Sequence, residues 1–402
     1  MSASAPLAGL RVVAVEQYGA GPFGTQWLAD LGAEVIKVEL PRDGGDVARA
    51  VGPHFAAELP RDRASLFFQS FNRNKKSLCL DLVRPEGRQI LHDLVRGADA
   101  LVNNLRGDVP ARLGLGYEVL AAANPRIVCA HLSGYGRDGS RAAWPGYDYL
   151  MQAEAGYFAL TGEPDGPPSR MGLSVIDMMG GTAMALGLLA GILDARRSGL
   201  GRDVDVALFD VAVFHLSYVG TWRLAAGTNT VRAARSAHPS LTPCQTYRTA
   251  DGWIYLMCNK EKFWRRLCEA VGRAEWLSDP RFVDFPARLA HREALTELLD
   301  RALSAHTTAQ WMLEFGGSIP AAPILDVAGA LENPFVAERG LVRMAEDAHG
   351  GLPMPASPIR TGGLPATDRA APGLGEHTRA LLCELGYPDE RIDALIADGV
   401  VQ

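Results

Sequence analysis

One carboxylate stands alone in the most apolar part of the chain. In LSVIDMMGGTAMALGLLAGIL, residues 173–193, Asp177 is the only ionisable residue, and the nearest charges in the sequence are Arg170 and Asp194. The Gly- and Ala-rich residues that follow predict a tightly packed helix. Because an unpaired buried carboxylate costs several kcal/mol, Asp177 needs a reason to be there. It caps the helix by accepting backbone N–H bonds at the positive end of the dipole, or it has a chemical role that the rest of the chain must explain.

A second pattern that could support chemistry lies near the N-terminus. Gly19, Gly21 and Gly24 form a GxGxxG motif after an apolar segment, and Glu39 lies twenty residues beyond Gly19. This is close to the dinucleotide-binding fingerprint. In that fingerprint, however, the first glycine directly follows the strand, whereas here residues 16–18 intervene. We therefore favour a tight strand-to-helix connection built from small residues, with an NAD or FAD site as the alternative.

The segments around these motifs alternate between two kinds of pattern. Short apolar, β-branched runs predict buried strands, and longer amphipathic runs predict helices. The predicted strands are residues 10–16, 34–39, 76–82, 100–104 and 127–134, and the predicted helices include 21–32, 86–96 and 117–123. Strands that alternate with helices indicate an α/β fold with a mostly parallel sheet and helices on both faces.

The length of 402 residues favours two domains over one. A loop rich in Thr, Arg, Ala and Ser at residues 226–240 interrupts the alternation, and Asp251–Gly252 then marks the turn of a predicted hairpin. The predicted division is a large α/β domain over 1–225, a small α/β domain over 226–325, and a return to the large domain over 326–402.

Composition narrows the class of protein further. The formal net charge of −6 contains no block of like charge, so a nucleic-acid partner is not expected. Six scattered cysteines without a CxxC pair suit a reducing compartment. The N-terminal residues do not resemble a signal peptide, and the glycines and the Asp in 173–193 leave that run too weak for a membrane span. We expect a cytoplasmic protein without a membrane partner.

Several motifs, in order along nearly the whole chain, resemble the class III CoA-transferases, the family of formyl-CoA transferase, carnitine CoA-transferase and the α-methylacyl-CoA racemases. They are LAGLRVVAVEQYGAGPFGTQWLADLGAEVIKVE, GGD, FNRNKKSLCLDL, NNLRGDVPARLGLGYEVL, NPRIVCAHLSGYG, PGYDYLMQAEAG, the stretch around Asp177, IPAAPI and GEHT. The resemblance implies a large Rossmann-like domain made from both ends of the chain, a small middle domain, and an interlocked homodimer.

The resemblance also implies a role for Asp177, since the family's catalytic carboxylate occupies this position. Asp177 would attack an acyl-CoA thioester to give a mixed anhydride and then an aspartyl-CoA thioester, from which CoA passes to a small carboxylic acid. Apolar surroundings would strip the carboxylate of water and raise its nucleophilicity. No metal or permanently bound cofactor is required, and the His and Cys residues show no metal-ligand spacing; the coenzyme A thioester is a substrate.

Other residues fall in the family's CoA-contact segments. Planar guanidinium groups suit the phosphates of CoA. Gln17 and Ala20 lie in the segment expected to line the CoA channel, where a polar and then a small side chain permit CoA to approach closely. The expected CoA- and substrate-binding residues are Gln17, Ala20, Arg42, Lys75, Asn104, Arg106, Arg112 and Tyr147. Backbone N–H groups of a glycine-rich segment are expected to stabilise the oxyanion.

Tyr147 bears on the choice between the two branches of the family. Racemases carry His thirty residues before the catalytic Asp, where this chain has Tyr147. A phenol with a pKa near 10 is a poor base at neutral pH, so a CoA-transferase is favoured over a racemase, which remains the alternative. Arg232 and Arg235 in the middle domain would suit a second carboxylate, as in succinate, and His238 could face the acyl group or be structural.

Overall fold

The structure is a computed structural model that describes residues 4–365 and 367–402 of the chain. Contacts between residues divide the chain into two compact units. Unit 1 comprises residues 1–155, 172–217 and 336–402, and unit 2 comprises residues 156–171 and 218–335. Each unit is described by itself.

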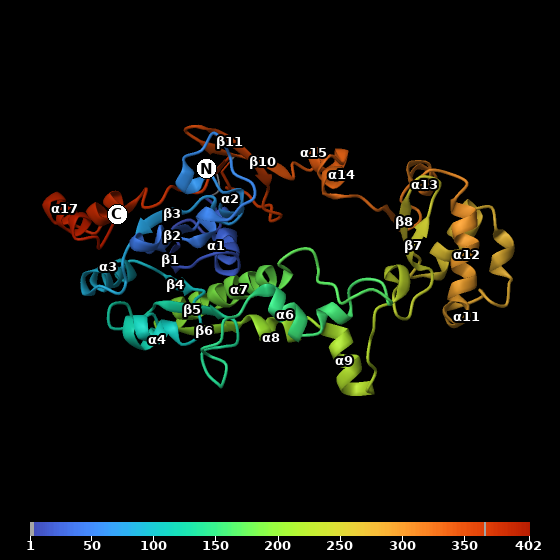
Figure 1. The fold of residues 1–402 in the computed structure, drawn as a ribbon, viewed down its shortest axis with the longest axis horizontal. Helices are drawn as coiled ribbons and strands as arrows, with labels where there is room; N and C mark the ends of the chain where they lie inside the picture. Colours follow the sequence, from blue (N-terminus) through green and yellow to red (C-terminus); the bar gives the residue numbers. More distant parts are fainter. Residues whose placement is uncertain (1–3, 366) are drawn as a thin grey trace. The chain divides into compact units, whose positions relative to one another are not determined.

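Unit 1 is built on a six-stranded sheet in which every neighbouring pair of strands is parallel (Figure 1). Its strand order is β3-β2-β1-β4-β5-β6. The strands are β1 (Arg11–Val15), β2 (Glu34–Glu39), β3 (Lys76–Cys79), β4 (Ala100–Asn103), β5 (Val128–Ser133) and β6 (Arg202–Ala207). The order reverses beside β1, and in such open parallel sheets ligands bind near this point, beyond the carboxyl ends of the strands. The predicted α/β class is confirmed.

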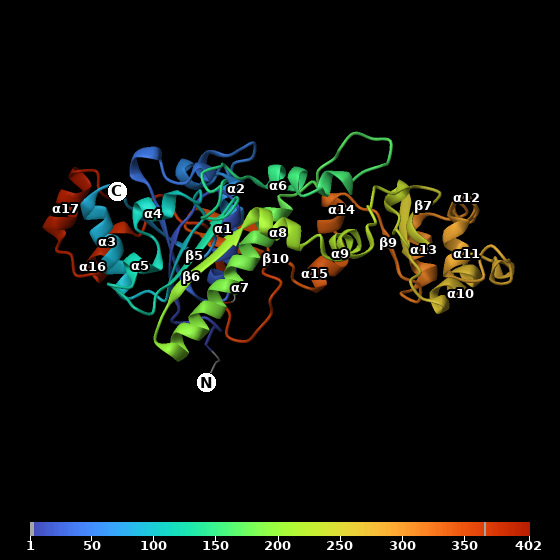
Figure 2. The same ribbon diagram turned by 90° about the horizontal axis from the view of Figure 1, so that it is seen from below.

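The helices of unit 1 cover both faces of the sheet (Figure 2). They are α1 (Ala20–Asp30), α2 (Leu66–Asn72), α3 (Pro85–Arg96), α4 (Val109–Leu113), α5 (Tyr117–Leu120), α6 (Asp148–Glu154), α7 (Val175–Ser198), α8 (Leu208–Phe214), α16 (Thr378–Glu384) and α17 (Asp389–Ala397). One face packs on α3, α5, α16 and α17, with Val13, Ile36 and Leu101 in the shared core. On the other face, α7 packs against α1, β5 and β6.

Helix α7 carries the apolar run found in the sequence. Among the described residues it is the one helix whose length and composition would suit a membrane span, and half of its most apolar window is buried. Glycines allow α1 and α7 to cross at close range: a Cβ atom built on Gly24 would lie 2.5 Å from the Gly181 carbonyl oxygen. Helix α7 packs on α1 and on strands β5 and β6, so it is part of the core of unit 1.

The C-terminal residues return to unit 1. A separate three-stranded sheet contains β10 (Val342–Asp347), β11 (Gly350–Pro355) and β12 (Asp368–Arg369). The hydroxyl of Thr378 then accepts the backbone N–H of Cys79 at 3.1 Å, and Leu80 forms a β-bridge with Val401. Both ends of the chain therefore contribute to the same core.

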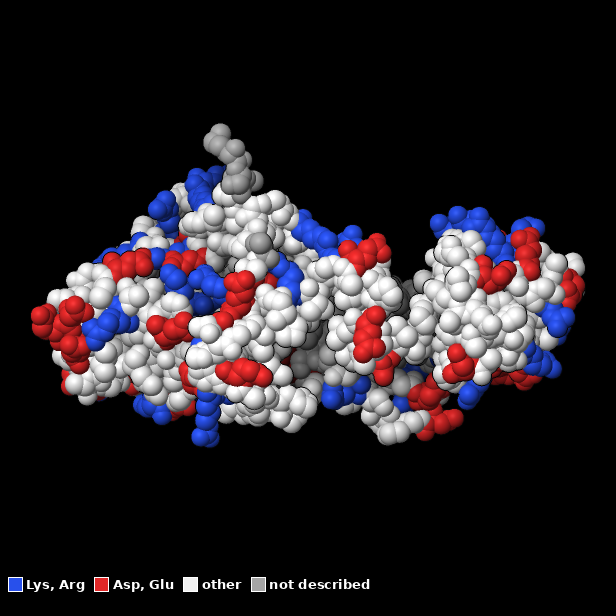
Figure 3. Space-filling view, turned by 90° about the horizontal axis from the view of Figure 1, so that it is seen from above, with Lys and Arg blue, Asp and Glu red and all other residues white. Residues whose placement is uncertain are grey.

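Unit 2 contains a small antiparallel sheet of strands β7 (Cys244–Arg248), β8 (Trp253–Met257) and β9 (Ala321–Pro323). The first two pair across the Asp251–Gly252 turn, as predicted. The helices of this part of the chain are α10 (Glu261–Ala270), α11 (Phe285–Ala290), α12 (Arg292–Leu303), α13 (Thr308–Phe315) and α14 (Val327–Leu331), while α9 (Ser217–Ala226) and α15 (Pro334–Glu338) span the boundaries with unit 1. Charged side chains of both signs are interspersed over the face drawn in Figure 3.

Candidate active site

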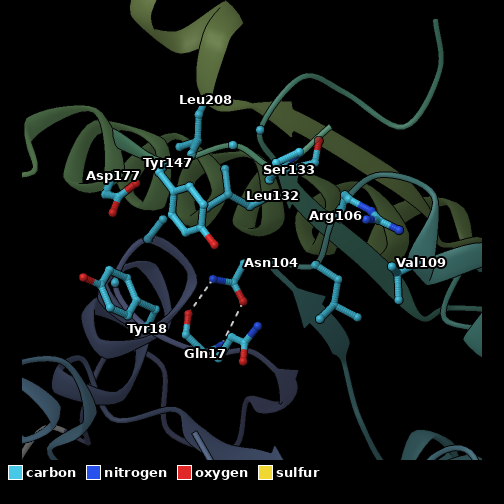
Figure 4. Close-up of a pocket in the computed structure, with 16 residues that line it drawn as sticks. Gln17, Tyr18, Asn104, Arg106, Val109, Leu132, Ser133, Tyr147, Asp177 and Leu208 are labelled. Carbon is cyan, nitrogen blue, oxygen red and sulfur yellow. Dashed lines mark hydrogen bonds between the residues drawn. The ribbon is translucent and has the colours of Figure 1, made fainter. Parts of the chain in front are cut away.

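A cavity of about 410 Å³ in unit 1 lies at the carboxyl ends of β1, β4 and β5. The loop after β1, the loop after β4 and the first turn of α7 all contribute to its lining (Figure 4). Asp177 and Tyr18 lie at one end of the cavity, and Arg106 and Val109 lie at the other. The parallel topology thus brings residues that are far apart in the sequence to one edge of the sheet.

Asp177 occupies the first turn of α7 and is only 8% exposed. Its carboxylate accepts no hydrogen bond from the described residues. The backbone N–H groups of Ile176 and Asp177 donate instead to Oδ2 of Asp148, at 2.6 and 3.0 Å. Asp148 therefore caps α7, and the interpretation of Asp177 as the cap is wrong. With the cap supplied by another residue, the side chain of Asp177 faces the cavity.

Asp148 is itself a buried residue at the start of α6. Its second oxygen, Oδ1, accepts a hydrogen bond of 2.5 Å from Nε2 of Gln152. Burial raises the pKa of Asp177 to about 7, and the nearby charge of Asp148 adds to this rise. Near neutral pH the poorly solvated carboxyl group of Asp177 is therefore present in both its protonated and its ionised form. The ionised form is the stronger nucleophile.

The loop between β1 and α1 is held in place by Asn104. The backbone N–H of Gln17 donates to Oδ1 of Asn104 at 2.9 Å, and Nδ2 of Asn104 donates to the Gln17 carbonyl at 2.7 Å (Figure 4). A Cβ atom on Gly21 would lie 2.8 Å from Asn104, so only glycine leaves room for this contact. Asn104 lies at the cavity as expected, and its amide braces the loop.

The glycines of the GxGxxG motif serve close packing at this site. A Cβ atom built on Gly19 would lie 3.1 Å from Oδ2 of Asp177, and Gly24 packs on Gly181 of α7. Gly19 precedes the first turn of α1, where no side chain caps the helix. The small residues thus bring the N-terminal ends of α1 and α7 together beside the carboxylate, as the tight-connection interpretation predicts.

The structure brings six of the nine expected site residues to this cavity. They are Gln17, Ala20, Asn104, Arg106, Tyr147 and Asp177. Arg106 and Arg112 both pair with Asp108 on the loop and helix after β4, and the Arg112 side chain is 64% exposed. Arg42 is exposed in a short 3₁₀ turn, Pro41–Asp43. Leu40, which precedes this turn, and Asp43, which ends it, line a second cavity of about 410 Å³.

Lys75 has a different environment from the one expected. Its ammonium group is fully buried, at 2.8 Å from Oε1 of Glu16, 2.9 Å from the Pro22 carbonyl and 3.1 Å from Oδ1 of Asn72. Burial lowers the pKa of Lys75 to about 8. All three donors are directed at protein oxygens, so Lys75 supports the loop before α1 and does not reach the cavity lining.

The middle-domain residues are also placed within unit 2. Arg235 pairs with the carboxylate of Asp300 at 2.7 Å, and Arg232 donates to the carbonyls of Gly166 and Pro167. His238 accepts backbone N–H bonds from Ser240 and Leu241 at Nδ1, which is a structural arrangement. The two guanidinium groups are therefore already bound to acceptors of the protein.

Three residues that the sequence did not single out complete the site: Tyr18, Ser133 and Asp148. Tyr18 and Ser133 line the cavity, and Asp148 lies immediately beneath it as the cap of α7. Among the described residues there is no cluster of three or more His, Cys, Asp or Glu side chains that could hold a metal ion. The carboxylate of Asp177 is a shielded group in the lining of the cavity.

Together, the doubly wound sheet and the cavity at its carboxyl edge, which holds the shielded carboxylate of Asp177, are features of an α/β enzyme. Residues 7–378 match the model of CoA-transferase family III, and the chain belongs to this family. It is a CoA-transferase.

Curated relatives and a solved structure match almost the whole chain. The chain is 36% identical to the acetyl-CoA:oxalate CoA-transferase of Acetobacter aceti over 390 residues, which cover 96% of this chain and 97% of the relative. It is 35% identical to the succinate–glutarate CoA-transferase of Agrobacterium fabrum, with 94% and 96% covered. A CAIB/BAIF family protein from Brucella suis has a TM-score of 0.82 at 34% identity and covers 95% of this chain and 100% of its own.

Proposed function

We propose that this enzyme transfers CoA from an acyl-CoA thioester to a small dicarboxylic acid, with Asp177 as the nucleophile. The observation that carries the proposal is the buried carboxylate of Asp177, which faces the cavity because Asp148 caps its helix. The relatives named for oxalate and for glutarate support a dicarboxylic acid as the acceptor.

The first half of the reaction loads CoA onto the enzyme. A carboxylate oxygen of Asp177 attacks the thioester carbonyl, the carbon–sulfur bond breaks, and CoA leaves as its thiolate. The thiolate then attacks the Asp177 carbonyl of the mixed anhydride, and the donor acid leaves as a carboxylate. Asp177 now carries CoA as a thioester.

The second half reverses these steps with the acceptor. The acceptor carboxylate attacks the Asp177 thioester carbonyl, which gives a new anhydride and the CoA thiolate. The thiolate attacks the acceptor's acyl carbon, and the product acyl-CoA leaves with the Asp177 carboxylate restored. No proton is gained or lost overall, so the site needs no separate acid or base, and no resident cofactor enters the scheme.

Each tetrahedral step develops negative charge on a carbonyl oxygen, either that of the acyl group bound to Asp177 or that of Asp177 itself. The N–H groups of Ala20 and Gly21, in the uncapped first turn of α1, have no acceptor among the described residues. Gly19, which adjoins them, lies against Asp177. We assign these two N–H groups the oxyanion role, because preorganised backbone donors stabilise such charge most strongly in a site that excludes water.

The anionic nucleotide end of CoA requires cations at the other end of the cavity. Arg106 lies there. Arg42 and Arg112 are exposed, and each is next in the sequence to a residue that lines the second cavity. A phosphate would compete with Asp108 for Arg106 and Arg112. We propose these three arginines, and not Lys75, as the phosphate contacts.

The enzyme is also proposed to act as a cytoplasmic homodimer. Large apolar side chains stay exposed within each unit, with Leu186 at 70%, Phe214 at 79% and Leu224 at 89%. Leu186 and Phe214 also line one open cavity of unit 1, and exposed apolar surface is common at obligate interfaces. Light scattering of the purified protein should give twice the chain mass of 43.1 kDa, and a monomer would contradict the dimer.

The experiment that tests the proposed function is a transfer assay with mass-spectrometric detection of acyl-CoA products. Glutaryl-CoA, succinyl-CoA and acetyl-CoA are each offered as donor, with oxalate, succinate and glutarate as acceptors, and no cofactor is added. Wild-type protein should form the new acyl-CoA, and both Asp177→Ala and Asp177→Asn should form none. Transfer by the Asn variant at the wild-type rate would overturn the assignment of the nucleophile.

A further inference from the structure

The backbone of Tyr18 has an unusual conformation for a bulky residue. Its φ angle is +66°, in the left-handed region that non-glycine residues rarely adopt. Such strain persists only where the surrounding structure enforces it, and it concentrates at functional sites. Tyr18 immediately precedes Gly19, the residue that lies against Asp177.

A buried ion pair enforces this conformation. Oδ1 of Asp46 accepts the backbone N–H of Tyr18 and that of Ala48, each at 2.9 Å. Oδ2 of Asp46 lies 2.8 Å from Nζ of Lys37, and neither side chain is exposed to solvent. Two buried charges thus support a single strained peptide of the loop.

The side chain of Tyr18 is held at the end of the cavity where transfer takes place. Its ring contacts Phe67, with 5.0 Å between ring centroids, and it remains 39% exposed. In Figure 4 it lies at the same end as Asp177, away from Arg106. Partial burial raises the pKa of Tyr18, and the charge of Asp177 adds to the rise. The phenol therefore stays protonated and can donate a hydrogen bond.

Few other groups could receive the second carboxylate of a dicarboxylic acid. Arg232 and Arg235 are bound to acceptors within unit 2. Among the described residues that line the cavity, Arg106 is the only cation, and it lies at the opposite end in a pair with Asp108. At the Asp177 end, the side-chain donors are the hydroxyl groups of Tyr18 and Tyr147.

We propose that Tyr18 is the residue that selects dicarboxylic acids: its ring packs on the carbon chain of the bound acid, and its hydroxyl donates a hydrogen bond to the carboxylate that does not receive CoA. The inference rests on the proposed function and adds a specificity determinant to it. A phenol suits this role. A hydrogen-bond donor that is fixed beside Asp177 would be left without a partner by an acid that lacks the second carboxylate, and the site therefore disfavours such an acid. A cation in the same place would instead pair with Asp177 and weaken it as a nucleophile.

A competition assay tests the proposal without depending on the donor. Succinate and butyrate, which differ by a carboxylate in place of a methyl group, are supplied at equal concentration with one glutaryl-CoA donor. The ratio of succinyl-CoA to butyryl-CoA then reports the ratio of the two kcat/KM values. Tyr18→Phe should lower this ratio by about tenfold, as expected for the loss of one hydrogen bond to a charged group. Tyr117→Phe is the matched control, because its hydroxyl donates to the Pro125 carbonyl outside the cavity lining.

The outcomes separate this inference from the proposed function. If the ratio of succinyl-CoA to butyryl-CoA is unchanged in Tyr18→Phe, or if the rates with the two acids fall equally, the role of Tyr18 is overturned. Transfer by the wild type would still uphold the proposed function. A wild-type enzyme that passes CoA to neither acid, nor to oxalate, overturns both. Tyr18→Asn guards against misfolding, because Asn tolerates the left-handed backbone; it should keep the wild-type melting temperature and show the same loss of selectivity.

Discussion

The buried carboxylate of Asp148 accepts the backbone N–H groups of Ile176 and Asp177, so that one aspartate caps the helix and the other faces the cavity. The two roles could have fallen to a single residue. Because Asp148 takes up the backbone N–H groups of Ile176 and Asp177, these donors do not bind the carboxylate of Asp177, where they would stabilise it and lower its nucleophilicity.

Asp148 should therefore influence both the stability of the protein and the titration of Asp177. Asp148→Ala removes the cap of α7 and should lower the free energy of unfolding by about 0.5–2 kcal/mol. It also removes a charge that raises the pKa of Asp177, so the pH at which activity is half-maximal should move down. Chemical denaturation and a pH–rate profile measure the two effects. Asp165→Asn, on an exposed residue of unit 2, is the control for a lost charge, and an unshifted profile in Asp148→Ala would contradict the coupling.

The raised pKa of Asp177 predicts how activity depends on pH. In the proposed mechanism only the ionised carboxylate attacks the thioester, so kcat/KM should rise with pH through a midpoint near 7 and then level off. The profile should be measured with saturating acceptor and limiting acyl-CoA. A flat profile between pH 5.5 and pH 8.5 would show that Asp177 is already fully ionised across this range.

The same shift predicts that Asp177, the proposed nucleophile, lowers the stability of the protein at neutral pH. Because the folded protein binds the proton of Asp177 more tightly than the unfolded chain does, the free energy of unfolding falls as pH rises from about 4 toward 7. Asp177→Asn removes this penalty and should stabilise the protein by up to ~4 kcal/mol at pH 8, with little difference near pH 4. Urea denaturation at the two pH values checks the prediction, and a variant that is less stable at pH 8 would refute it.

Gly19 should matter for catalysis and Gly24 for folding. A Cβ atom on Gly19 would press on Oδ2 of Asp177 at 3.1 Å, so Gly19→Ala should lower kcat at least tenfold with the fold intact. A Cβ atom on Gly24 would meet the Gly181 carbonyl at 2.5 Å, so Gly24→Ala should lower the free energy of unfolding by about 1–3 kcal/mol. Gly172→Ala is the control, since its Cβ would meet no atom within 4 Å. If Gly19→Ala and Gly24→Ala had the same effect on kcat and the same effect on the free energy of unfolding, the separate roles of the two glycines would be contradicted.

Arg106 should act on the binding of CoA and not on chemistry. Arg106→Ala should raise KM for the acyl-CoA donor by roughly tenfold or more, the loss expected for a charge-assisted bond to phosphate, with kcat nearly unchanged. Steady-state kinetics with the exposed Arg126→Ala as control measures the effect. A fall in kcat with unchanged KM would show that Arg106 acts on the chemical step, and would contradict its role in binding CoA.

The sequence predicts the sheet well because buried parallel strands have a strong local signal. The predicted strand over residues 34–39 coincides with β2, and the others differ from the observed strands by a few residues at their ends. Residues 76–82 were expected to form one strand, but β3 ends at Cys79 and Leu80 pairs with Val401 instead. That contact joins opposite ends of the chain, and no local pattern could indicate it.

The site is less predictable because a side chain's partners depend on tertiary packing. The isolation of Asp177 in an apolar run marks it as special, yet its distinction from a cap depends on Asp148, twenty-nine residues away. Lys75 has the charge expected of a phosphate contact, and only the fold shows that three protein oxygens surround it. The left-handed backbone of Tyr18 likewise depends on Asp46 and has no signature in the residue itself.

Trapping Asp177 in its acylated or CoA-loaded form tests the proposed covalent mechanism at the reacting atom. Wild-type protein is incubated with acyl-CoA alone, treated with hydroxylamine and digested, and the peptide that covers residues 171–196 is examined by mass spectrometry. We expect a hydroxamate at Asp177 that depends on acyl-CoA and is absent from Asp177→Asn. An unmodified Asp177 in an enzyme that is turning over, or a hydroxamate on a different residue, would contradict it.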